Sequence, residues 1–402
     1  MHINGGINTE KYWNCDVSKN ADISPLALSV TLSAYGDKII VKEGDWVSVG
    51  EPLTKNMKAH SSVSGKVVSA HSNSITIEND KHYNLSNTIR PFNKRLSDAS
   101  CDDLLEYISK LGIITDGQFL YDSIISRPEN TKVLLVSCSD TLPYISNEHH
   151  NILNSATQLV YGAKILAKAL SATSIVFCLE KRYKKTYIDF INNIKKQRTM
   201  DVMIHSSKYP ADKKYFLSKQ FASANRKCKF RYDDFFYVKG SVCSELFESF
   251  KTGCPVVRKN IVINGPISNN PCNVNVPIGT SIEEILRLTD NNLNDNTKII
   301  LDNSVNGKPA TVDSFIDKSN TAILLCKDES QVAENASCIS CNLCHKACPA
   351  NLFPAKFVEG NSSKVHKCID CGCCTYVCPS KIDIRSFIIK LRQEKEANNN
   401  EK

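Results

Sequence analysis

Apolar and polar residues alternate along residues 36–79, and glycines punctuate the runs at 41–50 and 63–68. A two-residue period interrupted by glycine is typical of short β-strands joined by tight turns. We therefore expect a small β module over residues 1–90.

From about residue 100 the pattern changes to helices that alternate with buried strands. Helices are predicted at 101–111, 152–170 and 184–195, and strands at 132–136, 174–179 and 200–205. This order predicts a parallel sheet with helices on its faces, in a domain over 91–250. No G-x-G-x-x-G or Walker loop follows the strands. Ligands of such sheets bind beyond the carboxyl ends of the strands, so we expect the site near 137–140 and Glu180.

Alternation returns after this domain. Residues 260–264 are strand-like, and Thr280 with Glu283 three residues later has the capping-box spacing of a helix start. These features predict a small β-grasp-like module over 251–325. Apolar residues at helical spacing between 382 and 396 predict a helix that closes the last domain.

The composition is that of a multidomain globular protein. A chain of 402 residues is too long for one compact core, and 42% hydrophobic with 23% charged residues argues against disorder. Since no apolar run approaches 18 residues and the start lacks a signal-peptide pattern, we expect a cytoplasmic location. The net charge of +8 comes from scattered lysines and arginines, and no nucleic-acid partner is expected.

Eighteen cysteines are many for a cytoplasmic chain unless a metal uses some of them. Eight form two runs of identical spacing: Cys338-x2-Cys341-x2-Cys344-x3-Cys348-Pro and Cys368-x2-Cys371-x2-Cys374-x3-Cys378-Pro. This spacing is that of two-cluster [4Fe–4S] ferredoxins. Single cysteines elsewhere are expected to be small buried apolar residues, namely Cys15, Cys101, Cys138, Cys178, Cys228, Cys243, Cys254, Cys272 and Cys326.

The two runs predict that the clusters share ligands. Three thiolates on a tight loop reach one cubane, while the fourth lies on the next helix and points away. We therefore assign Cys338, Cys341, Cys344 and Cys378 to one cluster, and Cys368, Cys371, Cys374 and Cys348 to the other, in a domain over 330–396. Zinc is the competing metal, but its paired-cysteine sites usually have a longer gap between pairs. Cys373 is an alternative ligand to Cys374, and His345 is expected to be a neighbour rather than a ligand.

The β module over 1–90 resembles the barrel-sandwich fold of lipoyl and biotinyl carriers. Met57-Lys58 matches the dipeptide that carries the modified lysine. Only five residues separate Lys58 from Ser64-Gly65, however, fewer than such carriers usually have before the closing turn. We therefore expect the fold without the attachment.

Taken in order, the modules resemble the RnfC family, the NADH-side subunits of Rnf electron-transport complexes, along nearly the whole chain. The resemblance rests on Gly5-Gly6, Val41-x-x-Gly44-Asp45-x-Val47, Ser64-Gly65, Lys208-Tyr209-Pro210, Gly253-x-Pro255, Asn270-Pro271, Ile278-Gly279-Thr280 and the cysteine runs. It implies a lipoyl-like module, a domain like the flavin/NADH domain of complex I, a β-grasp (SLBB-like) module and a dicluster domain. It also implies FMN and NADH beside the clusters, and a peripheral place on the cytoplasmic face of the membrane.

In that family a glycine-rich loop cradles FMN and NADH. The equivalent residues 112–121 keep only Gly117 of the loop's glycines, and a Cβ hinders the approach of backbone N–H groups to phosphate. The family's acidic segment retains Asp140 and a Pro-Tyr pair, and a further glycine segment is eroded at 302–307. Gly117, Asp140 and Glu180 are therefore the candidate residues of an altered flavin and NADH pocket.

Three functions stay open. In the first, NADH reduces a flavin, which passes single electrons to the clusters, in a chain bound to the other subunits of a membrane Rnf complex. In the second, the chain is a soluble carrier that feeds a flavoprotein or a cytosolic reductase such as proline reductase, or a paralogue without NADH oxidation. In the third, the clusters are structural and the chain is a scaffold.

Overall fold

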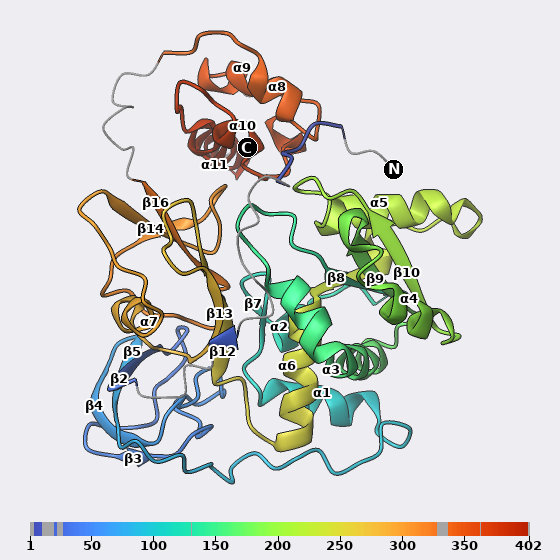
Figure 1. Cartoon of the computed structure of the whole chain (residues 1–402). Coiled ribbons are helices and arrows are strands. Elements are labelled where there is room, and N and C mark those ends of the chain that lie inside the picture. Colours follow the sequence, from blue (N-terminus) through green and yellow to red (C-terminus); the bar gives the residue numbers. More distant parts are fainter. Residues whose placement is uncertain are drawn as a thin grey trace.

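The computed structural model describes residues 4–9, 20–21, 27–129, 131–327, 337–361 and 363–400. Cys15 and part of the segment that precedes the first cysteine run lie outside these ranges. Figure 1 shows a β module in blue, an α/β domain in cyan to yellow-green, a second β-rich module in orange and a cluster module in red. No helix within the described part of the chain is long and apolar enough to cross a bilayer.

The first module is a four-stranded antiparallel sheet. Its strands, in spatial order, are β2 (Ser29–Ser33), β5 (Ser74–Asn79), β4 (Gly65–His71) and β3 (Trp46–Val47). The predicted alternation is confirmed in β5, where Ile75 and Ile77 point into the core. Gly65 is needed because an added Cβ would lie 1.9 Å from the carbonyl oxygen of Glu78 on β5.

The α/β domain has the predicted parallel sheet, with one more strand than the sequence indicated. The sheet order is β10 (Met200–His205), β9 (Ser174–Glu180), β8 (Val133–Cys138) and β11 (Phe235–Lys239). The helices are α1 (Cys101–Ser109), α2 (Leu120–Ile125), α3 (Asn147–Ala169), α4 (Ile188–Lys195), α5 (Lys214–Ala224) and α6 (Gly240–Thr252). A two-stranded hairpin, β6 (Ile114–Thr115) and β7 (Gln118–Phe119), precedes α2.

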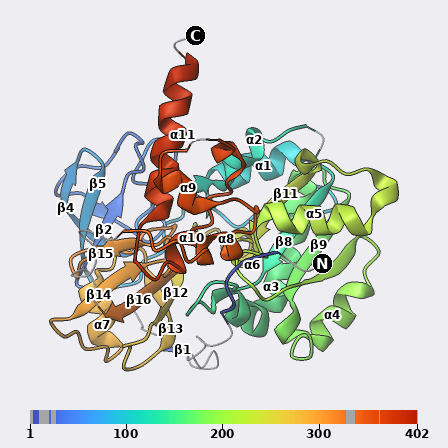
Figure 2. The same cartoon turned by 90° about the horizontal axis from the view of Figure 1, so that it is seen from above.

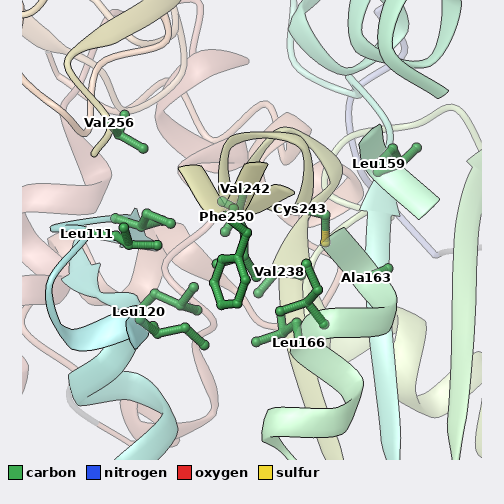
Figure 3. Close-up of a cluster of buried hydrophobic side chains, with 14 of the residues drawn as sticks. Leu111, Leu120, Leu159, Ala163, Leu166, Val238, Val242, Cys243, Phe250 and Val256 are labelled. Carbon is green, nitrogen blue, oxygen red and sulfur yellow. The ribbon is translucent and has the colours of Figure 1, made fainter. Parts of the chain in front are cut away.

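Both faces of this sheet are covered by helices. Alternate residues of β8 point to opposite sides: Leu134 and Val136 pack with α3 and α6, while Leu135 packs with Leu217 of α5. This explains why the strand is apolar throughout rather than alternating. Figure 3 shows the contact of α3 with α6, where Leu159, Ala163 and Leu166 meet Val242 and Phe250. This core continues without a break into the first module.

The third module is a six-stranded mixed sheet covered by one helix. The strand order is β1 (Asn20–Ala21), β13 (Cys272–Pro277), β12 (Arg258–Asn264), β16 (Ala322–Lys327), β14 (Thr297–Leu301) and β15 (Lys308–Ala310), and the helix is α7 (Ile282–Leu288). The predicted N-cap of α7 was wrong by one residue. Ser281, not Thr280, accepts a hydrogen bond from the Glu284 N–H. The Thr280 hydroxyl donates instead to the Pro277 carbonyl oxygen.

The last module is built from short helices around the cysteines. They are α8 (Leu343–Ala347), α9 (Pro354–Val358) and α10 (Cys373–Tyr376), followed by the longer α11 (Ile384–Asn400). The predicted closing helix is thus confirmed, and Figure 2 shows its end projecting from the body of the protein. Apolar residues Leu352, Phe357, Ile384 and Ile388 form the core between the helices.

A buried lysine joins three modules. The Lys318 ammonium donates to the carbonyl oxygens of Lys58 (2.8 Å) and Gly112 (2.9 Å), which belong to the first module and the α/β domain. Burial lowers the pKa of Lys318 to about 7. The three modules therefore meet at a buried polar contact in which one ammonium bonds to two backbone oxygens.

The α3–α6 contact makes a stability prediction. Gly162 of α3 lies so close to α6 that an added Cβ would stand 1.8 Å from the Cys243 carbonyl oxygen. Because backbone must move to admit a methyl group, Gly162→Ala should destabilise the protein by about 3 kcal/mol, the upper part of the usual overpacking range. Denaturant unfolding measures this, with the exposed Thr157→Ala of the same helix as control. Equal stability of the two variants would contradict the close packing of these helices.

Candidate cluster sites and the cavity at the strand ends

Two small cavities in the last module are each lined by four of the predicted cysteines. One, the first cluster site, is lined by Cys338, Cys341, Cys344 and Cys378. The other, the second cluster site, is lined by Cys348, Cys368, Cys371 and Cys374. The structure therefore brings together three thiols of one run and the fourth thiol of the other run at each site.

Local helical structure explains this exchange. The third cysteine of each run lies within a one-turn helix, α8 or α10, and the fourth follows just beyond that helix. The helix carries Cys348 and Cys378 away from the loops that precede them. Each fourth cysteine thus faces the loop of the other run.

The donor set and its surroundings fit a cubane cluster. Thiolates are the usual protein ligands of [4Fe–4S] clusters, and apolar residues such as Phe357 and Ile388 line the rest of the second site. The N–H groups of Leu352 and Asp370 donate to the sulfurs of Cys348 (3.3 Å) and Cys368 (3.4 Å). Within the described residues, no three His, Cys, Asp or Glu side chains converge closely enough to hold a single metal ion.

Cys373 also lines the second cluster site, whereas His345 is not among the residues that line either site. A hydrogen bond between the side chains of Cys371 and Cys373 lowers the pKa of Cys371 and raises that of Cys373. The His345 ring stacks on Phe353 (centroids 3.8 Å apart) and its Nδ1 donates to the Leu352 carbonyl oxygen.

A second candidate site lies at the carboxyl ends of the parallel strands. A cavity of about 600 Å³ is lined by residues 139–142 after β8, by residues 239–245 at the end of β11 and the start of α6, and by 256–260 of the third module. In the sheet, β9 lies on one side of β8 and β11 lies on the other. The cavity thus lies at the point where strand order reverses, the usual ligand position in such sheets.

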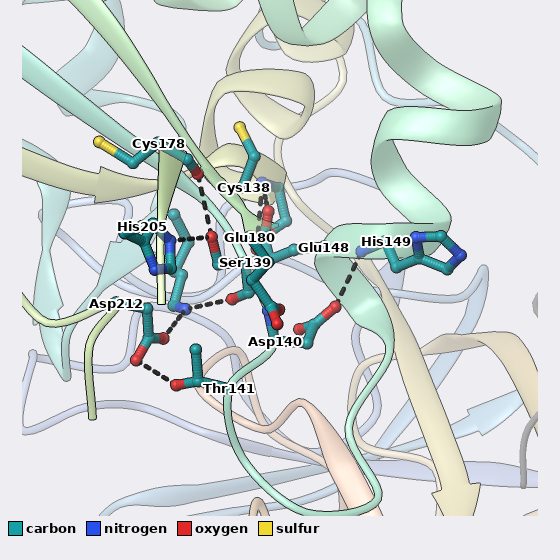
Figure 4. Close-up of polar contacts among 12 residues, drawn as sticks. Cys138, Ser139, Asp140, Thr141, Glu148, His149, Cys178, Glu180, His205 and Asp212 are labelled. Carbon is teal, nitrogen blue, oxygen red and sulfur yellow. Dashed lines mark hydrogen bonds and ion pairs between the residues drawn. The ribbon is translucent and has the colours of Figure 1, made fainter. Parts of the chain in front are cut away.

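Buried charged groups surround the base of this cavity (Figure 4). The Asp140 N–H donates to Glu180 Oε1 (2.8 Å), and Asp140 Oδ2 accepts from the His149 N–H (2.8 Å). Lys239 Nζ donates to Asp212 Oδ2 and to the Ser139 carbonyl oxygen, at 2.8 and 2.9 Å. Asp140 and Glu180 are therefore close together, as the strand order predicted.

The carboxyl groups here divide into two kinds. Burial raises the pKa of Glu148 and of Glu180 to about 7 and also raises that of Asp140. Burial also disfavours the charge of Asp212, but the Lys239 ammonium outweighs it and holds that pKa at about 2. The site can thus hold a proton near neutral pH beside a fixed ion pair.

The cations of the cavity are already bonded to protein groups. Lys239 pairs with Asp212, Lys259 Nζ lies 2.5 Å from Glu245 Oε1, and Arg258 donates to Asn275. A phosphate would have to compete with each of these partners, in a cavity whose lining also holds the Asp140 and Glu148 carboxyls. The lining is therefore poorly suited to a phosphorylated ligand.

The loop that resembles the family's flavin cradle is a β-hairpin here. Ile114 pairs with Phe119 and Thr115 with Gln118, across a turn in which Asp116 and Gly117 both have positive φ. An Asp-Gly turn of this kind is typical of two-residue hairpins, and its backbone pairs with itself instead of facing a ligand. The residues present therefore do not fit a flavin phosphate. Gly117 lies apart from Asp140 and Glu180, outside the lining of the cavity.

The hairpin instead contacts the first module. The Phe119 ring meets the Tyr35 ring edge to face (5.4 Å between centroids), and Lys58 Nζ lies 4.9 Å from the Phe119 centroid. Lys58 also pairs with Asp122 at 3.7 Å. The lysine of the Met57-Lys58 dipeptide is thus a packing residue of this contact.

Sequence reasoning missed part of the strand-end site. Glu148, Asp212 and Lys239 come from three elements that no sequence pattern connects with residues 137–140. Only Lys239 had an available signal, as a cation directly after the apolar run 235–238. Of the single cysteines, Cys138, Cys178, Cys243 and Cys272 are buried as expected, whereas Cys228 is exposed.

Thiol-lined cavities on a ferredoxin-type module, joined to a parallel α/β domain, define an iron–sulfur electron-transfer protein. Residues 119–227 match the Nuo51 FMN-binding domain family, and residues 330–379 match the 4Fe-4S dicluster domain family. Over most of its length the chain is similar to C subunits of ion-translocating oxidoreductase complexes, in line with the expected RnfC resemblance.

Three relatives illustrate this similarity. The RnfC-type subunit of the Na⁺-translocating ferredoxin:NAD⁺ oxidoreductase complex of Acetobacterium woodii is 23% identical, over 80% of this chain and 77% of that protein. Its counterpart in the proton-translocating ferredoxin:NAD⁺ oxidoreductase complex of Clostridium ljungdahlii is 23% identical, over 87% and 82%. The counterpart in the ion-translocating oxidoreductase complex of Rhodobacter capsulatus is 21% identical, over 88% and 73%.

Among solved structures, an NAD⁺-reducing [NiFe]-hydrogenase in its air-oxidized state overlaps 71% of this chain and 60% of its own. The identity is 11% and the TM-score 0.48. A likeness at this level does not by itself establish a common fold.

The buried carboxyl Glu148 makes a pH prediction. Its pKa is about 7 when folded and near 4.5 when free, so the folded state holds a proton that the unfolded state has released between these values. The wild type should therefore lose up to about 3 kcal/mol of stability as pH rises from about 4.5 to 7. Glu148→Gln lacks this loss, and the side-chain oxygen still accepts from Ser241. The two unfolding free energies should diverge with pH, in favour of the variant.

Denaturant unfolding at several pH values measures this divergence. Glu106→Gln is the control, because Glu106 is exposed and pairs only with Lys110 in its own helix. A constant difference between wild type and Glu148→Gln across the range would contradict the raised pKa.

The hairpin makes a cofactor prediction. Protein purified anaerobically should release far less than one flavin per chain on acid extraction, and added FMN should keep its free fluorescence. The reason is that the equivalent of the cradle is a two-stranded hairpin that keeps only Gly117 of the loop's glycines, and the cavity cations are paired. One bound flavin per chain would contradict the conclusion that these residues do not fit a flavin phosphate.

Proposed function

We propose that this chain transfers single electrons through two [4Fe–4S] clusters, as the RnfC-type subunit of an ion-translocating complex. The observation that carries the proposal is the pair of cavities, each lined by the first three cysteines of one run and the fourth cysteine of the other, with Cys373 as a further thiol at the second cavity. Four thiolates per cavity are the complete ligand set of a cubane. Each cluster takes up and releases one electron at a time.

The chain's residues would hold the clusters as follows. Cys338, Cys341, Cys344 and Cys378 ligate the first cluster, and Cys368, Cys371, Cys374 and Cys348 ligate the second. The backbone N–H donors at Leu352 and Asp370 stabilise negative charge on the sulfurs of the second cluster. Apolar residues such as Phe357 and Ile388 line the rest of the second site.

The other modules would hold the cluster domain within a larger complex. We assign a barrel-sandwich module to 1–90, a flavin/NADH-type α/β domain to 91–250, a β-grasp (SLBB-like) module to 251–325 and the cluster domain to 330–396. The antiparallel sheet of the first module and the helix-covered mixed sheet of the third support these assignments.

The partners would be the other subunits of the membrane complex. The relatives named above all belong to ion-translocating complexes, which favours this function over that of a carrier for a soluble reductase. The chain would lie on the cytoplasmic face of the membrane as a peripheral subunit.

Exchange of the fourth cysteines makes a direct test. Cys378→Ser should abolish the first cluster, although Cys378 belongs to the second run, and Cys348→Ser should abolish the second. Each variant should lose about half of the iron and sulfide, because a serine hydroxyl replaces one thiolate ligand. Cys373→Ser is the matched control and should keep both clusters.

Iron and sulfide analysis and EPR after anaerobic purification provide the measurements. The signal lost in Cys378→Ser should be the one lost in Cys341→Ser, and the signal lost in Cys348→Ser the one lost in Cys371→Ser. The exchanged ligand set would be disproved if Cys378→Ser lost the same signal as Cys371→Ser, and Cys348→Ser the same signal as Cys341→Ser. Zinc in place of iron would disprove the function.

A further inference from the structure

Tyr209 connects the α/β domain to the second cluster site. It follows β10 in the chain, yet its hydroxyl donates to the carbonyl oxygen of Cys371 at 2.8 Å. The side chain is 1% exposed. A residue 162 positions away thus holds the peptide that follows a predicted ligand.

The start of the chain fixes Tyr209 in this place. Ile7 and Tyr209 pair their backbones, with N···O distances of 2.9 and 3.0 Å, and the Gly6 N–H donates to the Ala347 carbonyl oxygen at 2.9 Å. An added Cβ would lie 2.8 Å from the Cys348 carbonyl oxygen at Gly5 and 2.6 Å from that of Tyr209 at Gly6. The paired glycines therefore allow the backbone of residues 5–7 to approach both Tyr209 and the cluster module closely. Figure 1 shows this first segment, in dark blue, beside the cluster module.

The two cluster sites differ in their surroundings. Tyr209 packs in a buried apolar cluster with Ile7, Val305, Ala347 and Cys373, next to the second site. At the first site, by contrast, Cys338 and Cys341 are exposed, and Ile339 between them is 65% exposed. The second cluster is therefore the one in contact with the body of the protein.

The phenol acts on the second site as a fixed dipole. The Tyr209 hydroxyl is the donor of this hydrogen bond, since a carbonyl oxygen can only accept. Its positive end points at the carbonyl oxygen of Cys371, the residue whose thiolate would carry part of the negative charge added to a bound cluster on reduction. Hydrogen bonding and burial are the protein's means of setting such potentials.

We infer that Tyr209 is a positioning residue that holds the Cys371 peptide and raises the reduction potential of the second cluster relative to the first. The inference rests on the proposed function, since it requires both clusters. It also assigns one role, contact with the second cluster site, to both the Lys208-Tyr209-Pro210 motif and the Gly5-Gly6 pair.

Tyr209→Phe tests this, because it removes the hydroxyl and keeps the ring. Tyr107→Phe is the matched control: its hydroxyl also donates to a backbone carbonyl oxygen, that of Arg90 at 2.7 Å, in a different part of the fold. Redox titrations followed by EPR give the potential of each cluster, and the loss of one signal in Cys371→Ser identifies the second.

In Tyr209→Phe the reduction potential of the second cluster should fall by up to about 59 mV, which is a change of about tenfold in the one-electron reduction equilibrium. The first cluster and both clusters of Tyr107→Phe should be unchanged. Unchanged potentials in a Tyr209→Phe protein with full iron content would overturn the inference, as would equal shifts of both clusters. Wild-type protein without clusters would instead overturn the proposed function.

If Tyr209→Phe assembles only one cluster, Gly5→Ala serves as a second variant. Its added Cβ would clash with the peptide group of Cys348, a predicted ligand of the second cluster. It should alter the EPR signal of the second cluster and leave that of the first. A change confined to the first signal would overturn the inference.

Discussion

The exchange of the fourth cysteine between the two runs is the constraint on which the rest of this structure depends. Cys348 faces the second loop and Cys378 faces the first, so neither site is complete until residues 338–378 have closed on themselves. The closed module then offers a single surface to the rest of the chain. Gly5 and Gly6 contact it through their backbone, and an added Cβ would not fit at either glycine. Tyr209 contacts it through its hydroxyl.

The α/β domain keeps the architecture of a ligand-binding sheet but has a different chemistry at its strand ends. Its cavity lies where the strand order reverses, yet Lys239 and Lys259 are neutralised by Asp212 and Glu245. The hairpin at 114–119 packs against Tyr35 and Lys58 of the first module. The segment that resembles a cofactor cradle thus joins two modules here.

Patterns local in sequence were predicted well. Each cysteine run carries its own loop and helix, so spacing alone indicated both sites, and three parallel strands followed from their apolar runs. The strand 235–239 and helix 240–252 were missed, because the strand is short and ends in Lys239. The cap at Ser281 was misplaced by one residue because Thr280 and Ser281 have the same capping chemistry.

What sequence could not give was the tertiary placement of isolated residues. Glu148, Asp212 and Lys239 lie far apart in the chain and meet only because β8, β10 and β11 end at one edge of the sheet. The same holds for Tyr209 and Cys371, and for Lys318 with the carbonyl oxygens of Lys58 and Gly112. Such contacts have no periodicity and no fixed spacing.

The central claim is that this chain carries electrons on two clusters. A redox titration of the anaerobically purified full chain, followed by low-temperature EPR, tests it most directly. The account predicts two reversible one-electron reductions with [4Fe–4S] signals that interact magnetically, because the two sites share one small module. A protein that contains zinc, or iron that cannot be reduced reversibly, would contradict it.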